Sequence, residues 1–120
     1  MLHKIAFATA LAVLAAAPAS WAFSTPPLSG QTSGYRWLTC RVVNTDIVPH
    51  DVTLKIVQAN TGVVKAAESF TLPPGRGNAV EVGSDFVGAC DVTGISKSLS
   101  RTSFCVEDNM SNCLSVVAVP

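Results

Sequence analysis

Hydrophobic and polar positions alternate with a period of two through most of the chain after residue 34, which predicts β-strands. The alternation is clearest in 51–58, where Val52, Leu54 and Ile56 share one face. Turn residues separate the segments, and the expected strands are 35–44, 51–58, 63–72, 79–82, 86–92, 96–106 (a long strand or hairpin arm) and 114–119. About seven short strands without helical periodicity predict an all-β fold, an antiparallel β-sandwich that is immunoglobulin-like at most.

Residues 35–44 are expected to form a core strand. Its two faces follow from the alternation: Leu38, Cys40 and Val42 on one, and Tyr35, Trp37, Thr39, Arg41 and Val43 on the other. An immunoglobulin domain would place a tryptophan after the first core cysteine and a tyrosine two residues before the second. Here Trp37 comes before Cys40, and Gly88 occupies the tyrosine position.

Glu68 interrupts the hydrophobic face of segment 63–72. A charge in the middle of such a face predicts a β-bulge, or a split of this segment into two short strands.

The first 22 residues have the pattern of a secretory signal peptide. A short basic start leads into the apolar run 5–17, which is too short to span a membrane, and small residues follow. Cleavage is expected after Ala22, or else after Ala19; the alternative is an apolar helix packed on the domain. A lipoprotein signal is excluded because the first cysteine, Cys40, lies far beyond the apolar run.

The predicted organisation is therefore a signal peptide over 1–22, a flexible arm over 23–34 and one sandwich domain over 35–120. The arm is rich in Pro, Gly, Ser and Thr, which predicts either flexibility or an irregular edge segment. Residues 23–120 carry seven basic and eight acidic side chains without charge runs, so neither nucleic acid nor an anionic membrane is an expected partner.

All four cysteines follow the predicted signal, and an even count in an exported chain predicts two disulfides. Three connectivities are possible. We favour Cys40–Cys90, which joins two strand centres, together with Cys105–Cys113, which closes a short polar loop.

Catalytic and metal-binding patterns are weak. His50 is the one histidine after residue 22, and Asp46 or Asp51 could orient it, but no serine stands in a nucleophile-elbow motif. We therefore expect a solvated turn histidine and no enzymatic activity. One histidine and oxidised cysteines also argue against zinc or copper, and no cofactor is expected.

Two polar loops carry groups that could bind a ligand. Asp108, Asn109 and Asn112 offer oxygens for calcium but lack the spaced acidic pattern of such sites. Gly75–Arg76–Gly77 offers amides and a guanidinium for phosphate but lacks the full P-loop pattern. We expect structural loops in both places.

The outer face of strand 35–44 is the candidate partner surface. Tyr35, Trp37 and Arg41 belong to the residue types enriched at binding hot spots. In the competing interpretation the rings are covered by the arm through Phe23 or Leu28, or a bulge turns Trp37 inward.

Four short motifs carry a resemblance: Leu38–Asn44, Leu72–Gly75, Ala89–Val92 and Ser100–Ser103. Their order resembles that of small exported β-proteins of Gram-negative bacteria whose function is unknown. The resemblance implies export and a β-fold, and it implies no activity or site residue.

The expected function is that of a non-enzymatic protein of the periplasm or the medium that binds a macromolecule or supports the envelope. Two alternatives are a secreted inhibitor presenting the loop 105–113 and a pilus-like surface-assembly subunit.

Overall fold

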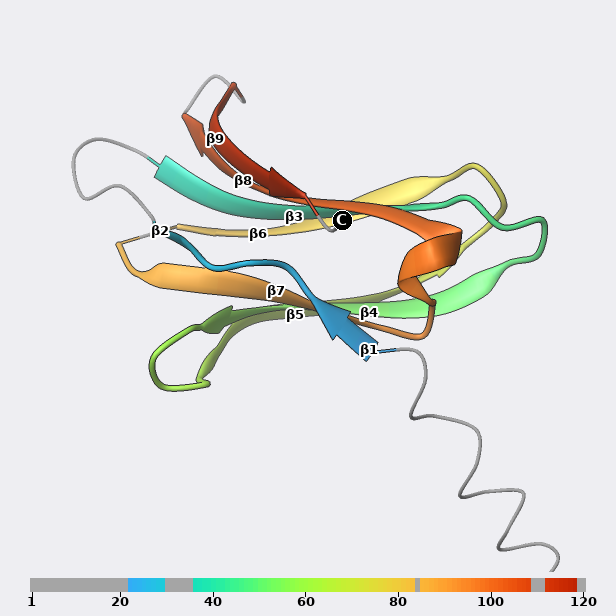
Figure 1. Cartoon of the computed structure of the whole chain (residues 1–120), viewed down its shortest axis with the longest axis horizontal. Coiled ribbons are helices and arrows are strands. Elements are labelled where there is room, and N and C mark those ends of the chain that lie inside the picture. The colour runs from blue at the N-terminus through green and yellow to red at the C-terminus, as the bar shows by residue number, and fades with distance from the viewer. Residues whose placement is uncertain (1–21, 30–35, 84, 109–111, 119–120) are drawn as a thin grey trace, which may run out of the picture.

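The structure, a computed structural model, describes residues 22–29, 36–83, 85–108 and 112–118. These residues form two layers of antiparallel strands (Figure 1). One layer, the β4 sheet, has the order β1-β7-β4-β5, with β2 also paired to β7; the other, the β3 sheet, has the order β6-β3-β8-β9. The strands are β1 (Ala22–Ser24), β2 (Leu28–Ser29), β3 (Arg36–Asn44), β4 (His50–Gln58), β5 (Val64–Leu72), β6 (Gly77–Gly83), β7 (Val87–Thr93), β8 (Ser100–Asp108) and β9 (Cys113–Ala118). The predicted antiparallel β-sandwich is confirmed.

The core lies between the facing surfaces of the two sheets. It contains the inward side chains that the alternation indicated: Leu38, Cys40, Val42, Val52, Leu54, Ile56, Cys90 and Val92, joined by Ile95, Phe104 and Val106, all at most 1% exposed. Side chains of the two sheets interdigitate here because each strand turns alternate residues toward the other layer.

Both disulfides have the favoured connectivity. Cys40 of β3 is bonded to Cys90 of β7, with their Cα atoms 6.1 Å apart, so this bond crosses the core and joins the two sheets. Cys105 of β8 is bonded to Cys113 of β9, with Cα atoms 5.7 Å apart, and closes the β8–β9 hairpin.

The strand order differs from that of an immunoglobulin domain. In that fold the strand after the second core cysteine stays in the sheet of that cysteine. Here β8, which follows β7, crosses to the β3 sheet and pairs with β3 along nine residue positions. The sandwich thus shares the inter-sheet disulfide with the immunoglobulin pattern but not the placement of the strand that follows the second core cysteine.

Part of the predicted arm pairs with the sandwich. Residues 23–24 and 28–29 of the arm, together with Ala22 at the end of the predicted signal, form β1 and β2 against β7, while Phe23 and Leu28 pack on the core. Thr25 fixes this segment, because its hydroxyl accepts the amide of Cys90 at 3.0 Å and its own amide donates to the Cys90 carbonyl. Residues 30–34 of the arm and residues 1–21 of the predicted signal lie outside the described residues.

Glu68 does not break its strand. β5 runs without interruption. Its ladder with β4 shifts register between Ile56 and Val57 of β4, which face the start of β5. Because β5 is the edge of its sheet, Glu68 reaches solvent from the inward-facing side of the strand. The predicted bulge exists, but its position next to Glu68 was wrong.

The predicted strand 96–106 begins later than expected. Lys97–Leu99 form a 3-10 turn, η1, closed by the Leu99 amide donating to the Ser96 carbonyl at 3.1 Å, and β8 starts at Ser100. No helix among the described residues is long and apolar enough to cross a membrane.

Asn44, at the end of β3, fastens two connections at once. Its side-chain amide donates to the carbonyls of Val48 at 2.9 Å and Leu72 at 2.8 Å, and its side-chain oxygen accepts the Asp46 amide at 2.8 Å. The side chain is fully buried. The β3–β4 connection and the end of β5 are therefore held by one residue.

Candidate functional site

Trp37 lies on the outer face of the β3 sheet. Its strand neighbours Leu38 and Cys40 are fully buried, so the alternation of the strand directs Trp37 outward, where it is 39% exposed. Phe23 and Leu28 instead pack on the core. The competing interpretation, in which either the arm or a bulge buried this ring, was wrong. Tyr35, the other predicted aromatic residue of the surface, lies outside the described residues.

The indole of Trp37 lies over the end of β6. Trp37 and Gly83 are register partners, and a side chain on Gly83 would meet the ring at 3.8 Å. One part of the ring therefore covers the β6 backbone, and the rest faces solvent.

Arg41 is bound to an acidic neighbour on β8. Its guanidinium donates to the Glu107 carboxylate at 2.5 Å; the Arg41 side chain is half exposed, whereas that of Glu107 is almost completely buried. Glu107 is also the register partner of both Trp37 and Cys113. Of the predicted partner residues, Arg41 therefore also has a structural role, because it neutralises a buried carboxylate beside the hairpin disulfide.

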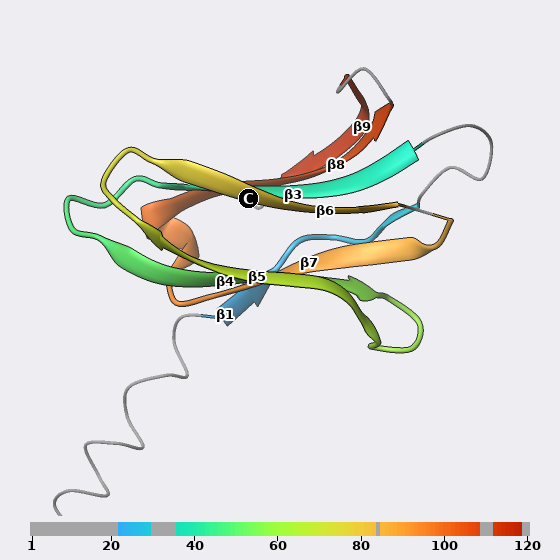
Figure 2. The ribbon, with the colours of Figure 1, turned by 180° about the vertical axis from the view of Figure 1, so that it is seen from behind.

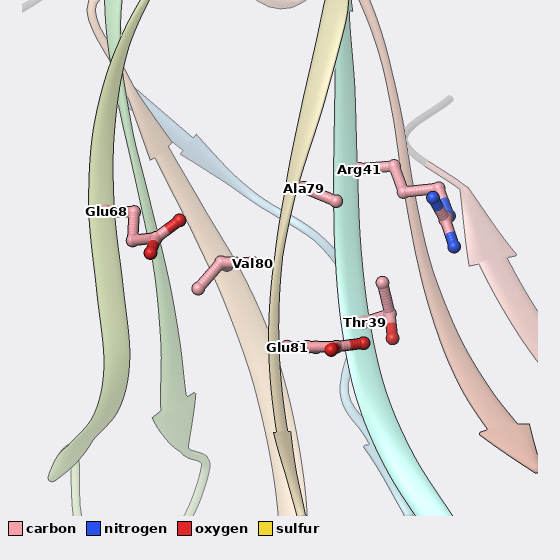
Figure 3. Close-up of a pocket in the computed structure, with 6 residues that line it drawn as sticks. All are labelled: Thr39, Arg41, Glu68, Ala79, Val80 and Glu81. Atoms are coloured by element: carbon pink, nitrogen blue, oxygen red, sulfur yellow. The ribbon is translucent and has the colours of Figure 1, made fainter. Parts of the chain in front are cut away.

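A depression of about 400 Å³ adjoins this face at the edge of the sheet (Figure 3). Its lining combines β3, β5 and β6: Thr39, Arg41, Glu68, Ala79, Val80 and Glu81. The close-up shows the Glu81 side chain directed toward Thr39, Glu68 on the far side of β6, and the Arg41 guanidinium turned away. The hydroxyl of Thr39 is buried and has no hydrogen-bond partner among the described residues.

The two carboxylates of this depression, Glu68 and Glu81, were not predicted from the sequence to line one site. Glu68 and Glu81 belong to different sheets and line the same depression from opposite sides of β6, because the turn after β5 brings β6 alongside β5 (Figure 2). The sequence predicted a strand over Ala79–Val82, which includes Glu81. It did not indicate the register of this strand against β3.

A second depression, of about 600 Å³, is larger and more apolar. It lies in the β4 sheet beside the end of β4 and the start of β7. Phe86 and Val87 contribute to its lining, and the amine of Lys65 sits 5.4 Å from the centre of the Phe86 ring. The lysine gives this ring a cationic cover from within the chain.

The expectation of a solvated turn histidine was wrong, because His50 is buried at the start of β4 and is paired with Asp46. The two side chains approach to 2.8 Å between Nε2 and Oδ2, and the His50 side chain is only 8% exposed. The hydrogen bond from His50, together with one from the Ile47 amide, lowers the pKa of Asp46 below its ordinary value of 3.8. Rather than facing solvent, this pair closes the β3–β4 connection and offers a substrate little surface.

The lowered pKa of Asp46 predicts a pH dependence of stability. A carboxyl whose pKa is lower in the folded than in the unfolded state stabilises the fold above its unfolded pKa, and the contribution is lost as the pH falls through the folded value. We therefore expect urea midpoints to fall as the pH is lowered below about 4. In Asp46→Asn this part of the decline should be absent, whereas Asp85→Asn, an exposed control that removes the same charge, should follow the parent; equal profiles for all three would contradict the assignment.

The loops considered as ligand sites use their polar groups internally. Asp108 accepts the Asn112 amide at 3.0 Å, and its own amide donates to the Asn112 carbonyl at the same distance. Gly75 and Arg76 direct their amides to the carbonyls of Asn44 and Pro73. Asn109 lies outside the described residues.

One group of potential metal ligands occurs among the described residues. The sulfurs of Cys105 and Cys113 and a carboxylate oxygen of Glu107 lie within 4.8 Å of one another. The two sulfurs are bonded to each other, and Arg41 binds the carboxylate, so the group is a disulfide beside an ion pair.

Comparisons with protein families, curated proteins and solved structures gave no match. The two disulfides fit a non-reducing, exported environment. Any functional assignment therefore depends on the outer face of the β3 sheet itself: a half-exposed indole, a guanidinium shared with Glu107, and an acidic depression at the β6 edge.

Proposed function

We propose that this chain is an exported, non-enzymatic β-sandwich that binds another macromolecule through the outer face of its β3 sheet. The exposed indole of Trp37 is the observation that carries the proposal, because large exposed aromatic residues are enriched at binding hot spots. The neighbouring guanidinium of Arg41, half exposed and held by Glu107, adds a polar contact of the same kind.

The compartment we propose is the periplasm or the medium of a Gram-negative bacterium. The basic start, apolar run and small residues of 1–22 support export by a cleaved signal peptide. The core disulfide supports the same destination, since such bonds persist in oxidising compartments.

Truncating the indole should separate binding from folding. We expect Trp37→Ala to lose capture of the partner from periplasmic extract and medium by roughly tenfold or more. Its stability should fall by about 1 kcal/mol, because only the cover over Gly83 is removed. The measurement is quantitative pull-down with mass spectrometry, alongside urea unfolding.

Val87→Ala is the matched control, since this side chain is 44% exposed on the opposite sheet. It should capture the partner as the parent does. Capture that is equal for parent and Trp37→Ala would contradict the proposed surface. Inhibition of proteases or lysozyme by the purified chain would favour the inhibitor alternative, and concentration-dependent polymers on a sizing column would favour a surface-assembly subunit.

A further inference from the structure

The outer edge of β6 has backbone groups available for another strand. Among the described residues, β6 pairs only with β3. The Ala79 amide does not donate to the β3 ladder; it faces away from β3 and donates at 2.8 Å to the side-chain oxygen of its neighbour Asn78, which an added strand would replace as acceptor. Because backbone groups alternate in direction along a strand, the amides and carbonyls of Gly77, Ala79, Glu81 and Gly83 face the open edge.

The side chains beside this edge leave room for a strand. Three of the four outward positions of β6 are small: Gly77, Ala79 and Gly83. Gly77 is required by close approach, since a Cβ there would lie 2.7 Å from the Val42 carbonyl oxygen. The small side chains of β6 therefore lie beside the larger side chains of β3, and the depression of about 400 Å³ is located along β6.

The charge of the edge is negative. Glu81 and Glu68 are both exposed, and neither forms an ion pair with the described residues. Arg41, the one basic residue lining the depression, is bound to Glu107 and points away (Figure 3). The buried, unpartnered hydroxyl of Thr39 adds a hydrogen-bonding group to the same depression.

We propose that the β6 edge binds an extended, basic segment of a partner protein as an additional strand of the β3 sheet. Main-chain hydrogen bonds to the edge would supply affinity, and alternate lysine or arginine side chains would meet Glu81 on the outer face and Glu68 at the opening between the sheets. The proposal rests on the proposed binding function and names the chemistry of its partner.

The β5 edge of the other sheet is less suited to strand addition. Glu68 occupies an inward-facing position of β5, and inward charges on edge strands are a device against strand addition. At β6 the corresponding inward residue, Val80, is apolar and 5% exposed. The asymmetry directs an added strand to β6 and leaves Glu68 as its charge partner.

A synthetic peptide of seven residues, the length of β6, tests this directly. The probe alternates lysine and valine; one comparison peptide has glutamate for lysine, and another has N-methyl groups on alternate amides, which cannot form a ladder. Binding is read from the fluorescence of Trp37, the one tryptophan after the predicted signal peptide, and from calorimetry. We expect measurable affinity for the lysine peptide, loss of binding for both comparison peptides, and weakening by salt.

Charge reversal locates the site. Glu81→Lys should weaken lysine-peptide binding by roughly tenfold, because a favourable cross-strand pair becomes a repulsive one. Asp51→Lys, an exposed change of equal charge on the opposite sheet, should leave it within about twofold. Equal weakening by both variants, undiminished binding of the N-methylated peptide, or no binding at millimolar peptide would each overturn the proposal.

The outcomes also separate this inference from the proposed function. If the chain captures a partner through Trp37 but does not bind the lysine peptide, the proposal for the β6 edge is refuted and the proposed function of the outer face stands. Peptide binding that survives Trp37→Ala, together with no captured partner, would support the edge and refute the Trp37 surface.

Discussion

Replacing Cys40 and Cys90 together by alanine should lower the free energy of unfolding by about 4 kcal/mol. In the chain-entropy model the stabilisation grows with the length of the closed loop, and this bond closes a loop of 50 residues. It also crosses the core, where both sulfurs are fully buried. A loss of this size is a large part of the stability expected for a small domain. Urea unfolding followed by circular dichroism measures it.

The hairpin disulfide supplies the matched control. Cys105→Ala with Cys113→Ala opens a loop of only 8 residues, for which the same model gives about 2.5 kcal/mol. We expect this variant to stay folded with a midpoint between those of the parent and the core variant. The reverse order of the two midpoints would show that loop length does not govern the contribution of these bonds.

Asn44→Asp should be about as destabilising, at about 4 kcal/mol, although it changes only one functional group. Aspartate cannot donate to the carbonyls of Val48 and Leu72, and it places a negative charge beside both in a fully buried position. Thermal and urea unfolding at pH 7 provide the measurement. Because burial raises the pKa of a carboxyl, the deficit relative to the parent should shrink as the pH is lowered and the introduced group takes up a proton.

Asn78→Asp makes the same chemical change at an exposed residue of β6. We expect a change of less than about 0.5 kcal/mol, since an exposed carboxylate remains hydrated and can still accept the Ala79 amide. If both variants lost equal stability, the buried hydrogen bonds of Asn44 would not be its main contribution.

The fold was predictable from the sequence where two faces of a strand differ. Leu38 and Val52 belong to strands with one buried and one exposed face, so period two revealed their direction, and the cysteines at strand centres indicated an inter-sheet bond. β1 and β2 were not predictable, because such short pairings depend on β7 being present as a template. β5 was misjudged because an edge strand tolerates Glu68, and edge position is a property of the whole sheet.

The candidate site was predictable only in part, for a similar reason. The direction of Trp37 follows from the alternation within its own strand, whereas its contact with Gly83 depends on the register between β3 and β6. The neutralisation of Arg41 by Glu107 joins residues 66 positions apart. Asn44 is of a residue type common in turns. Nothing in its local sequence indicated that its buried side chain would bond both the β3–β4 connection and the end of β5.

The core disulfide also determines how the domain would respond to a pulling force. Tension applied between the two ends of the described chain passes from Cys40 to Cys90 through the sulfur atoms, so β4, β5 and β6 lie outside the loaded path. About 170 Å of chain, at roughly 3.4 Å per residue, is thereby withheld from extension. The proposed strand-binding edge on β6 is within this shielded loop, and the chain could be anchored at its ends and stretched without load being applied along that strand.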